Sequence, residues 1–522
     1  MAKKIMIQGT MSNSGKSFLA AALCRIFAQD GCRTAPFKSQ NMALNSYITE
    51  DGLEIGRAQA MQAEAAGIAP TVEMNPILLK PTSQMGSQVI IMGEVYGNLR
   101  AMDYYKRKTE FIPVIQKAFA KLEEQYDVIV LEGAGSPAEI NLRENDIVNM
   151  GMAQMADAPV LLVGDIDRGG VFASLYGTVS LLEPEERARI KGLVINKFRG
   201  DVEILKPGLD MIEERLGIPV VGVIPMEQID LDDEDSLAER LESRGMPGEP
   251  DCQPILDIAV IRLPHLSNFT DFNGLQQFPG VNVRYVDRAS GLGAPDLVIL
   301  PGTKNTMEDL KWLRERGLEA ALIRTTEEKD TPLVGICGGF QMLGQQLSDP
   351  EGAEGTAGST MRGMGLLELE TVFTMKKTRT RITGIMEQGF GTFSGGTRMT
   401  VEGYEIHMGE TREIQTEEAE TEKTKKQKSD PAFRLSDGRM DGRIRQDGLV
   451  FGTYLHGIFD NQVWTESLLS RLAQKKGLTL KSAAQSREAY RQQQYDKLAD
   501  LVRNSLDMKA IGRIMGFSED EG

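Results

Sequence analysis

A cysteine set between small residues is the sharpest chemical signal in the chain. In TPLVGICGGFQMLG an apolar run leads into the turn GICGG, and a helical pattern follows. Small residues on both sides permit the strained strand-to-helix turn that holds a nucleophile clear of a sheet. A helix amino terminus also lowers the pKa of a thiol and favours the thiolate. We therefore predict that Cys337 is a nucleophile, with backbone N–H groups of Gly338 and Gly302 as its oxyanion hole.

A thiol nucleophile needs a base, and the whole chain has three histidines. His456 lies in LVFGTYLHGIFDN, where a strand-like run ends in a glycine-flanked turn. His407, in GYEIHMGE, also ends a strand pattern and is the rival, whereas His265 is expected to be structural. We predict that His456 carries the proton and that His407 has a substrate-side or structural role. The alternative for Cys337 is an ordinary buried cysteine, which the flanking glycines disfavour.

A second chemical signal lies near the amino terminus, where GTMSNSGKS separates a strand pattern from a helix pattern. In that context a glycine-rich turn aims backbone N–H groups and a helix amino terminus at phosphates. Lys16 is expected at the β- and γ-phosphates of ATP, and Ser17 at Mg²⁺. The spacing is one residue longer than the common phosphate-loop motif, and the alternative is a surface turn. The predicted phosphate-binding residues are Gly9, Thr10, Ser14, Gly15, Lys16 and Ser17.

Polar residues that end neighbouring strands would complete this nucleotide site. Glu132 ends the strand pattern YDVIVLEG, and we expect it to join Ser17 as a metal ligand. Asp165 and Asp167 end APVLLVGDID in the same way, and for all three acidic residues the alternative is to cap a helix or a turn. Asn196, at the end of IKGLVINKF, is a candidate contact to the base or the sugar, with a structural role equally open.

Such a nucleotide site also needs an acceptor for the phosphoryl group. ATP with Mg²⁺ turns a carboxylate into an acyl phosphate, which ammonia can attack to give an amide. A negatively charged substrate would need cationic and amide donors beside the loop. Candidates follow a probable second strand in PFKSQNMALNS or lie further on: Lys38, Gln40, Asn41, Asn45, Arg57 and Lys80.

The elements that must position these residues alternate between buried strands and helices. KKIMIQG, YDVIVLEG, APVLLVGDID, IKGLVINKF and IPVVGVIP are strand patterns with helical patterns between them, which predicts a parallel sheet covered on both faces. After a polar stretch the alternation restarts with ILDIAVIRLP, VNVRYVD, DLVILPG and TPLVGICGG. We predict two doubly wound α/β domains. The expected boundaries are 1–230 for a P-loop NTPase-like synthetase domain, 231–254 for a linker, 255–475 for the second domain with a charged insertion at about 413–430, and 476–522 for a helical tail.

Bulk composition narrows the class of protein. With 522 residues the chain is too long for one ordinary core. A net charge of −16 argues against nucleic acid or an anionic membrane as the main partner. The four cysteines are scattered without a C-x-x-C pair, the amino terminus does not read as a signal peptide, and no apolar run approaches the ~18 residues of a membrane span. We therefore expect a cytoplasmic enzyme.

These motifs resemble known families. GICGG with a later GTYLHG resembles the class I, triad-type glutamine amidotransferases, and GTMSNSGKS resembles dethiobiotin synthetase and its relatives. The two in this order and at this length resemble the cobyric acid synthase family, and the resemblance covers nearly the whole chain. The other phrases that carry it are KSQNMALNS, EIGRAQAMQAEAAG, MNPILLKP, LEGAGSPAEINL, DIDRGGVFAS and GYEIHMG.

The resemblance implies a specific activity. Such an enzyme amidates the b, d, e and g carboxylates of adenosylcobyrinic acid a,c-diamide with ATP, Mg²⁺ and L-glutamine, giving adenosylcobyric acid in cobalamin biosynthesis. Cys337 would form the glutamyl thioester and His456 would move protons. Asp146, in NLRENDIVNM, becomes a substrate-side candidate by its position, beside Lys38, Gln40 and Asn41. The corrin brings its own cobalt, so no protein-bound transition metal is expected, and whether the chain forms a homo-oligomer stays open.

One departure from the amidotransferase pattern leaves a role unassigned. Most triad enzymes carry Glu two residues after the histidine, whereas this chain reads His456-Gly-Ile. Asp460 is our candidate for orienting the imidazole instead. Two rival functions also stay open: the sister enzyme cobyrinic acid a,c-diamide synthase, and a regulatory P-loop ATPase with a non-catalytic amidotransferase-like module.

Overall fold

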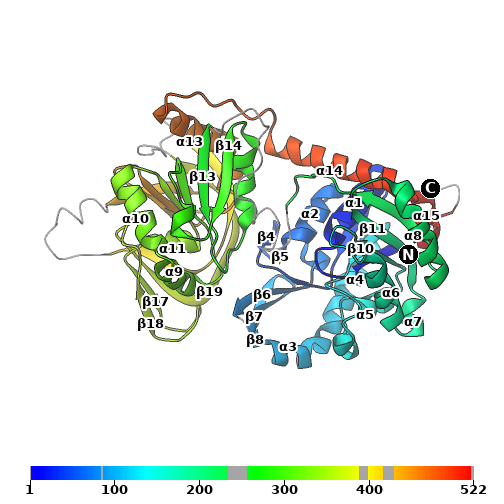
Figure 1. Cartoon of the computed structure of the whole chain (residues 1–522). Coiled ribbons are helices and arrows are strands. Elements are labelled where there is room, and N and C mark those ends of the chain that lie inside the picture. Colours follow the sequence, from blue (N-terminus) through cyan, green and yellow to red (C-terminus); the bar gives the residue numbers. More distant parts are fainter. Residues whose placement is uncertain (1, 84–85, 233–254, 387–397, 415–427, 519–522) are drawn as a thin grey trace. The chain divides into compact units, whose positions relative to one another are not determined.

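The computed structural model divides the chain into two compact units, each with its own sheet and core (Figure 1). The first unit holds residues 1–43, 53–234 and 488–522, and the second holds 44–52 and 235–487. The structure describes residues 2–83, 86–232, 255–386, 398–414 and 428–518. The last four residues lie outside the described residues, and so do most of the predicted linker and most of the charged insertion.

The first unit is built on a sheet of six parallel strands in the order β12-β11-β10-β1-β9-β2. The strand patterns read from the sequence between residues 3 and 225 all appear in it, which confirms the predicted doubly wound domain. The strands are β1 (Lys3–Gly9), β2 (Thr34–Phe37), β9 (Val128–Glu132), β10 (Val160–Asp165), β11 (Ile190–Phe198) and β12 (Val220–Pro225).

Alternating side chains of these strands fill two separate cores, one on each face of the sheet. In β1, Met6 belongs to one core, whereas Ile5 and Ile7 belong to the other, as the two-residue period of a strand requires. The first core is closed by α4 (Ile112–Gln125), α6 (Val171–Leu181) and α8 (Val202–Leu216), and the second by α1 (Lys16–Gln29), α2 (Arg57–Ala65), α14 (Arg487–Ser505) and α15 (Met508–Met515). Both faces are therefore covered by helices (Figure 1).

The carboxyl-terminal helices pack on the amino-terminal sheet. The sequence predicts a helical tail at 476–522. Its helices α14 and α15 bury Tyr495, Leu498 and Ile511 in the second core of the first unit. Ion pairs to α1 accompany this packing, with Asp496 2.8 Å from the Arg25 guanidinium. Apolar spacing alone could not reveal which unit these helices would cover.

A smaller sheet in the first unit was not predicted. Its order is β3-β6-β7-β8, and β6, β7 and β8 pair antiparallel. Its members are β3 (Gln40–Met42), β6 (Ile77–Ser83), β7 (Gly86–Ile91) and β8 (Glu94–Arg100), and the unit also holds β5 (Glu54–Gly56), α3 (Ala101–Arg107), α5 (Met150–Met155), α7 (Pro184–Arg187) and the 3₁₀ helices η1 (Val72–Met74), η2 (Lys108–Phe111) and η3 (Ile140–Asn145).

The second unit contains an 11-stranded sheet around one apolar core. Its parallel part has the order β14-β13-β15-β16-β23: β13 (Leu256–Ile261), β14 (Val281–Val286), β15 (Leu297–Leu300), β16 (Leu333–Ile336) and β23 (Val450–Thr453). The remaining strands are β17 (Gln346–Asp349), β18 (Ser359–Arg362), β19 (Leu369–Met386), β20 (Met399–Glu413), β21 (Ser429–Leu435) and β22 (Met440–Arg445), with β4 (Ser46–Ile48) in the same unit. The helices are α9 (Thr306–Glu315), α10 (Leu318–Lys329), α11 (Gly338–Leu343), α13 (Gln462–Lys475) and the 3₁₀ helices η5 (Phe269–Gln277), η6 (Ala289–Gly291) and η8 (Ile458–Asp460). The parallel strands confirm the second doubly wound domain, whereas the long β19–β20 hairpin was not foreseen.

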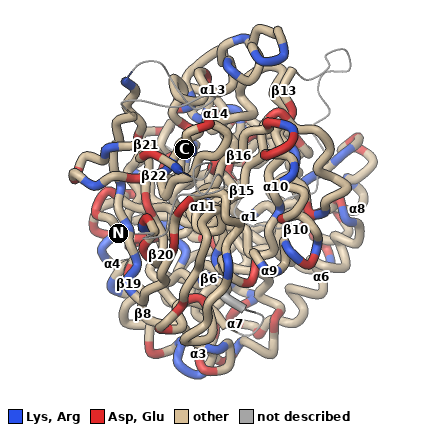
Figure 2. The backbone as a smooth tube through the Cα atoms, turned by 90° about the vertical axis from the view of Figure 1, so that its left-hand side faces the viewer, with Lys and Arg blue, Asp and Glu red and all other residues tan. Residues whose placement is uncertain are grey.

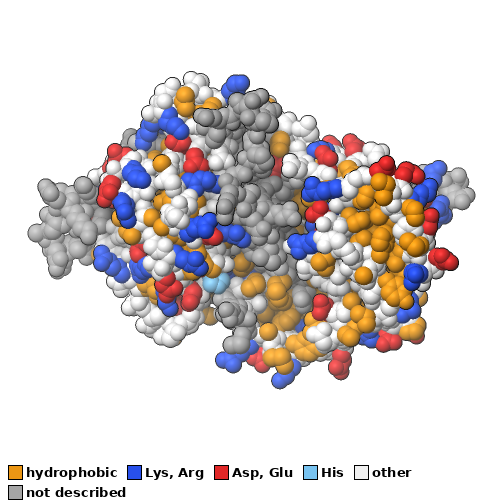
Figure 3. All heavy atoms as spheres, viewed as in Figure 1, with side chains coloured by type: hydrophobic (Ala, Val, Ile, Leu, Met, Phe, Trp, Pro, Cys, Tyr) orange, Lys and Arg blue, Asp and Glu red, His pale blue; other side chains and the backbone are white. Residues whose placement is uncertain are grey.

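Basic and acidic residues are mixed, whereas exposed apolar side chains gather on part of the surface. Figure 2 shows that basic and acidic residues alternate along the backbone. Figure 3 shows hydrophobic side chains gathered on the visible face of the first unit, where α6 and α8 leave Tyr176, Ile204 and Met211 exposed. Within the described residues no helix is long and apolar enough to cross a membrane.

Candidate active site

The backbone turns sharply at Cys337. Strand β16 ends directly before it and α11 begins directly after it, as the sequence predicted. Cys337 adopts φ 49° and ψ −109°, a conformation that costs a non-glycine residue energy and persists only where packing imposes it. A Cβ at Gly339 would lie 1.9 Å from the carbonyl oxygen of Leu300, so that position requires glycine. The strained turn presents the sulfur above the carboxyl edge of the parallel strands.

His456 and an acidic residue form a buried pair in the second unit. His456 follows β23, and its Nδ1 lies 2.6 Å from Oδ2 of Asp271 in η5. The backbone N–H of Gly457 donates to the other carboxylate oxygen at 3.2 Å. Asp271 therefore fixes the ring orientation and keeps the proton on Nδ1. The sequence candidate for this role, Asp460, is wrong: its carboxylate pairs with Arg487 at 3.3 Å. Because Asp271 lies 185 residues before His456, no local motif could identify it.

The electrostatics of this pair favour a charged imidazole. Burial lowers the pKa of His456, but the Asp271 carboxylate and the nearby Cys337 outweigh that effect and raise the pKa to about 10. The Nε2 atom is buried and has no hydrogen-bond partner among the described residues. The ring of Tyr404 stacks on the imidazole with a centroid distance of 5.1 Å. His456 is thus held as an acid next to the sulfur, with one nitrogen left to serve a substrate.

The two glycines predicted as an oxyanion hole both lie beside the sulfur. A Cβ at Gly302 would be 3.2 Å from Cε1 of His456 and 3.7 Å from Cβ of Cys337. Gly338 follows Cys337 directly, and a Cβ there would approach the backbone nitrogen of Thr303 at 3.1 Å. A side chain at either position would crowd these neighbours, so glycine suits both positions.

Strand β20 forms another wall of the thiol centre. Cys337 Sγ lies 3.6 Å from the carbonyl oxygen of Ile406. Gln341 of α11 donates from Nε2 to the carbonyl oxygen of Met408 at 3.0 Å. His407 lies within β20 rather than at the end of a strand, and its ring stacks on Tyr454 at 3.7 Å. Sequence reasoning missed Gln341 and Tyr454, although Gln341 is only four residues beyond the cysteine.

The third histidine belongs to a different cluster. Nδ1 of His265 lies 2.7 Å from Oδ1 of Asp309, and the backbone N–H of His265 donates to the same carboxylate. Asp309 is buried in α9 and raises the pKa of His265 through this hydrogen bond. The arrangement fits the structural role expected from the sequence.

The phosphate loop in the first unit runs from the end of β1 to the start of α1. Gly15 adopts φ 91° and Asn13 φ 61°, left-handed conformations that turn successive N–H groups toward one side of the loop. Lys16 is buried and folds over the loop, donating from Nζ to the carbonyl oxygens of Met11 at 2.9 Å and Gly135 at 3.2 Å. A Cβ at Gly9 would lie 2.2 Å from Oγ of Ser14, which explains the first glycine.

Two hydroxyl groups of this loop have unused hydrogen-bonding capacity. Oγ1 of Thr10 and Oγ of Ser14 are both buried, and neither has a hydrogen-bond partner among the described residues. Buried hydroxyl groups normally find a partner, and phosphate oxygens are acceptors of the kind they lack. The predicted phosphate-binding residues therefore form one continuous cradle of hydroxyl, ammonium and backbone N–H donors.

Three donors converge on the carboxylate of Glu132. Ser17 Oγ donates to Oε1 at 2.8 Å, Lys38 Nζ donates to the same oxygen at 3.0 Å, and Gln62 Nε2 donates to Oε2 at 2.6 Å. The structure thus brings the two predicted metal ligands, Ser17 and Glu132, into contact. Gln62 of α2 was not foreseen, because nothing in its local sequence marks it.

The other polar residues at the sheet edge support the loop or each other. Asn196 donates from Nδ2 to the carbonyl oxygen of Ser14 at 2.9 Å, so it braces the loop from below. Asp165 pairs with Lys197 at 3.0 Å. Asp167 pairs with Arg199 at 3.0 Å. These contacts give the three residues structural partners in the first unit.

The residues predicted for an acidic substrate have varied surroundings. Gln40 accepts from the Tyr104 hydroxyl at 2.5 Å, and Asn41 donates to Gln59 at 3.1 Å. The remaining candidates bind acidic or backbone groups: Lys80 pairs with Glu54, Arg57 with Asp232, and Asn45 accepts from the backbone N–H of Phe269.

Asp146 holds a turn together. Oδ1 accepts from the backbone N–H groups of Val148 and Asn149, each at 2.9 Å, and Oδ2 accepts from that of Gly151 at 2.8 Å. A carboxylate with these three bonds orders the entry to α5. The local sequence gave no sign that both oxygens would be used by the backbone.

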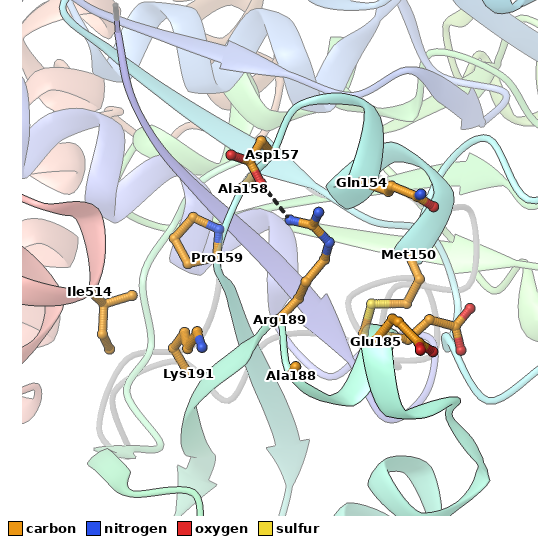
Figure 4. A pocket seen from close by; sticks show the side chains of 11 residues that line it. Met150, Gln154, Asp157, Ala158, Pro159, Glu185, Ala188, Arg189, Lys191 and Ile514 are labelled. Carbon is orange, nitrogen blue, oxygen red and sulfur yellow. Dashed lines mark hydrogen bonds and ion pairs between the residues drawn. The ribbon is translucent and has the colours of Figure 1, made fainter.

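A hollow of about 440 Å³ lies elsewhere in the first unit (Figure 4). Its lining includes Pro159 and Arg189, which directly precede β10 and β11, and Arg189 pairs with Asp157 at 3.0 Å. The hollow therefore opens at the amino ends of the parallel strands, whereas the phosphate loop follows a carboxyl end. None of the candidate site residues lines it.

Comparison with known proteins gives one family match in each half of the chain. Residues 5–236 match the CobQ/CobB/MinD/ParA nucleotide binding domain, and residues 257–464 match the CobB/CobQ-like glutamine amidotransferase domain. A protein of Lachnoclostridium phytofermentans named cobyric acid synthase is 55% identical over 521 residues, covering 99% of each chain. Another of that name, from Ruminiclostridium cellulolyticum, is 54% identical over 523 residues, covering 100% of this chain and 99% of its own. A solved structure of PurLQS from Thermotoga maritima covers 42% of this chain and 100% of its own at 21% identity and a TM-score of 0.31.

Proposed function

Because the chain belongs to the family of cobyric acid synthases, we propose that it amidates the b, d, e and g carboxylates of adenosylcobyrinic acid a,c-diamide. The product is adenosylcobyric acid, in cobalamin biosynthesis. Each amide takes its nitrogen from glutamine and its driving force from ATP. The observation that carries the proposal is the pairing, in one chain, of the Cys337–His456–Asp271 cluster with a phosphate loop.

In the second unit the reaction begins with attack by sulfur on glutamine. The Cys337 thiolate adds to the carboxamide carbon, and backbone N–H groups of Gly302 and Gly338 bind the developing oxyanion. The His456 imidazolium gives its Nε2 proton to the amide nitrogen, the C–N bond breaks and ammonia leaves. A water molecule then attacks the glutamyl thioester while His456 takes up its proton, which releases glutamate and restores the thiolate. Asp271 holds the imidazole through both steps.

In the first unit a corrin carboxylate attacks the γ-phosphorus of ATP and ADP leaves. Lys16, the hydroxyl groups of Thr10 and Ser14, and the loop N–H groups bind the phosphates. Ammonia then attacks the acyl phosphate carbon and phosphate departs, which leaves the amide. Lys38, buried beside Glu132, is the cation we assign to the carboxylate end of the corrin substrate.

The contact between Ser17 and Glu132 fits a magnesium ion. A hydroxyl and a carboxylate oxygen are ligands of the kind Mg²⁺ takes from proteins, with phosphates and water supplying the rest. Within the described ranges no group of three or more His, Cys, Asp or Glu residues could hold a metal by itself. Bound Mg²⁺ would neutralise charge on the β- and γ-phosphates.

Since a reduced thiol is needed at residue 337 and ATP is a substrate, we place the enzyme in the cytoplasm.

The mass of the corrin product tests this proposal. Purified protein is incubated with adenosylcobyrinic acid a,c-diamide, ATP, Mg²⁺ and glutamine, and the product is analysed by mass spectrometry. We expect four carboxylates to become carboxamides. No change on this substrate, together with two amidations of cobyrinic acid, would instead establish the sister activity of the a,c-diamide synthase. Nucleotide hydrolysis without corrin amidation would support a regulatory ATPase.

A further inference from the structure

The imidazole of His407 is a buried acceptor without a donor. Its side chain is 8% exposed, and Nδ1 lies 3.2 Å from the carbonyl oxygen of Gly409. A carbonyl oxygen accepts only, so Nδ1 must carry the hydrogen and Nε2 must present a lone pair. Nε2 has no hydrogen-bond partner among the described residues. Because buried polar atoms normally have a hydrogen-bond partner, this nitrogen has the capacity to accept one from a molecule that enters the site.

The ring is fixed beside the thiol centre. It stacks on Tyr454 with a centroid distance of 3.7 Å and an interplanar angle of 20°. The Tyr454 hydroxyl accepts from Gln341 of α11 at 3.2 Å. The residue before His407 in β20 is Ile406, whose carbonyl oxygen lies 3.6 Å from Cys337 Sγ. The His407 ring thus packs on Tyr454, which is hydrogen-bonded to the helix that follows the nucleophile.

We propose that Nε2 of His407 accepts a hydrogen bond from an N–H group of the glutamine that reacts with Cys337. The inference rests on the proposed function and adds a substrate contact to its second unit. Glutamine carries two such donors, the carboxamide that is cleaved and the α-ammonium group. Both offer N–H, and the experiment below separates them.

The charges around His407 keep it an acceptor. Burial, together with the positive charges of His456 and Arg439, lowers the pKa of His407 to about 3 against the opposing effect of the hydrogen bond to Gly409. Glu405, whose carboxylate is 4.0 Å from Nε2, is paired with Arg439. A neutral imidazole cannot hand an acidic proton to ammonia, so it can hold an N–H group without consuming the nucleophile that the enzyme must deliver.

Three substitutions test the contact. His407→Phe keeps a ring against Tyr454 and removes both nitrogens. His407→Gln places an acceptor oxygen near the position of Nε2, whereas His407→Asn keeps only the polar atoms near Nδ1. Glutamine hydrolysis is measured as glutamate release in the full chain, with glutamine and with glutaramate, which lacks the α-amino group. Thermal melting and amidation of the corrin with ammonium chloride are measured on every variant.

We expect about a tenfold to 100-fold loss of kcat/KM for glutamine in the Phe and Asn variants, and recovery of most of it in the Gln variant. If the donor is the α-ammonium group, wild type prefers glutamine to glutaramate and His407→Phe abolishes that preference. If the donor is the carboxamide, kcat falls equally for both substrates. The inference is overturned if folded His407→Phe and His407→Asn hydrolyse glutamine within twofold of wild type. It is also overturned if kcat/KM for glutamine is no higher in His407→Gln than in His407→Asn. Failure of wild type to hydrolyse glutamine would instead overturn the proposed function.

Discussion

Replacing Asp271 by Asn tests the acid–base assignment of the thiol centre. The carboxylate has two contacts, Oδ2 to Nδ1 of His456 at 2.6 Å and Oδ1 to the backbone N–H of Gly457 at 3.2 Å. An asparagine keeps the shape and the contact to Gly457 through its oxygen. It then turns an NH₂ group toward Nδ1, which forces the hydrogen onto Nε2. The pKa of His456 would fall because the neighbouring negative charge is gone, so a neutral ring would replace the imidazolium beside the thiolate. With its hydrogen on Nε2, that ring could not take up the proton of the attacking water.

The size of the effect follows from these two losses. A wrong tautomer in a nucleophile–histidine–carboxylate system costs about four orders of magnitude in kcat when the base is essential for activation. A thiol is easier to ionise than a hydroxyl, so we expect a loss of roughly 10²- to 10⁴-fold, or about 3 to 5 kcal/mol of transition-state stabilisation. KM for glutamine should change much less, since Asp271 acts through His456 rather than on the substrate.

The assay is glutamate release by the full chain, with corrin amidation from ammonium chloride measured in parallel. Asp271→Asn should lose the first activity and keep the second. Asp460→Asn is the matched control, because that carboxylate pairs with Arg487 and should leave both activities within about threefold. The assignment of the orienting role to Asp271 would be refuted if Asp271→Asn hydrolysed glutamine at the wild-type rate, or if Asp460→Asn lost glutamine hydrolysis.

Three further predictions address the remaining parts of the two centres. Lys16→Ala should abolish ATP-dependent amidation, because the buried ammonium of the phosphate loop is lost, while glutamine hydrolysis persists in part. If this variant still amidated the corrin with glutamine or with ammonium chloride, Lys16 would not be the phosphate-binding cation. Gly302→Ala should reduce glutamine hydrolysis about tenfold or more, because its Cβ would lie 3.2 Å from the His456 ring, and melting temperature should report an intact fold. The raised pKa of His456 should stabilise the native state fully below about pH 6.5, and this stabilisation should be lost as the pH rises toward 10. Wild type should therefore melt at a higher temperature than His456→Gln at low pH, and the difference should shrink as the pH rises. A difference that grows with pH would contradict the pairing with Asp271.

The sequence predicted those parts of the site that local patterns encode. A strand, a glycine-rich turn and a helix occur in succession at both Gly9–Ser17 and Gly335–Gly339, so periodicity and turn chemistry identify both centres. Cys337 and His456 could be paired because only three histidines were available. Parallel strands were likewise visible as short apolar runs bounded by glycine, proline or aspartate.

Contacts that depend on distant chain segments could not be read in this way. Asp271 reaches His456 across 185 residues, and Gln62 reaches Glu132 across 70. Asp460 was the nearest acidic residue in sequence, but the backbone turn of η8 directs it to another partner. Strand β20 was visible as a pattern, yet only its pairing in the sheet places Ile406 and His407 beside the thiol. The helices α14 and α15 show the same limit, since their apolar faces do not say which core they close.

The central claim is that this chain holds two separable reactions, release of nitrogen at Cys337 and activation of a carboxylate at the phosphate loop. Its most direct test is corrin amidation by the Cys337→Ser variant, measured with glutamine and with ammonium chloride as alternative nitrogen sources. We predict that no amide forms from glutamine and that amidation from ammonium chloride proceeds at the wild-type rate. Loss of both activities in a folded variant, or retained use of glutamine, would contradict the account.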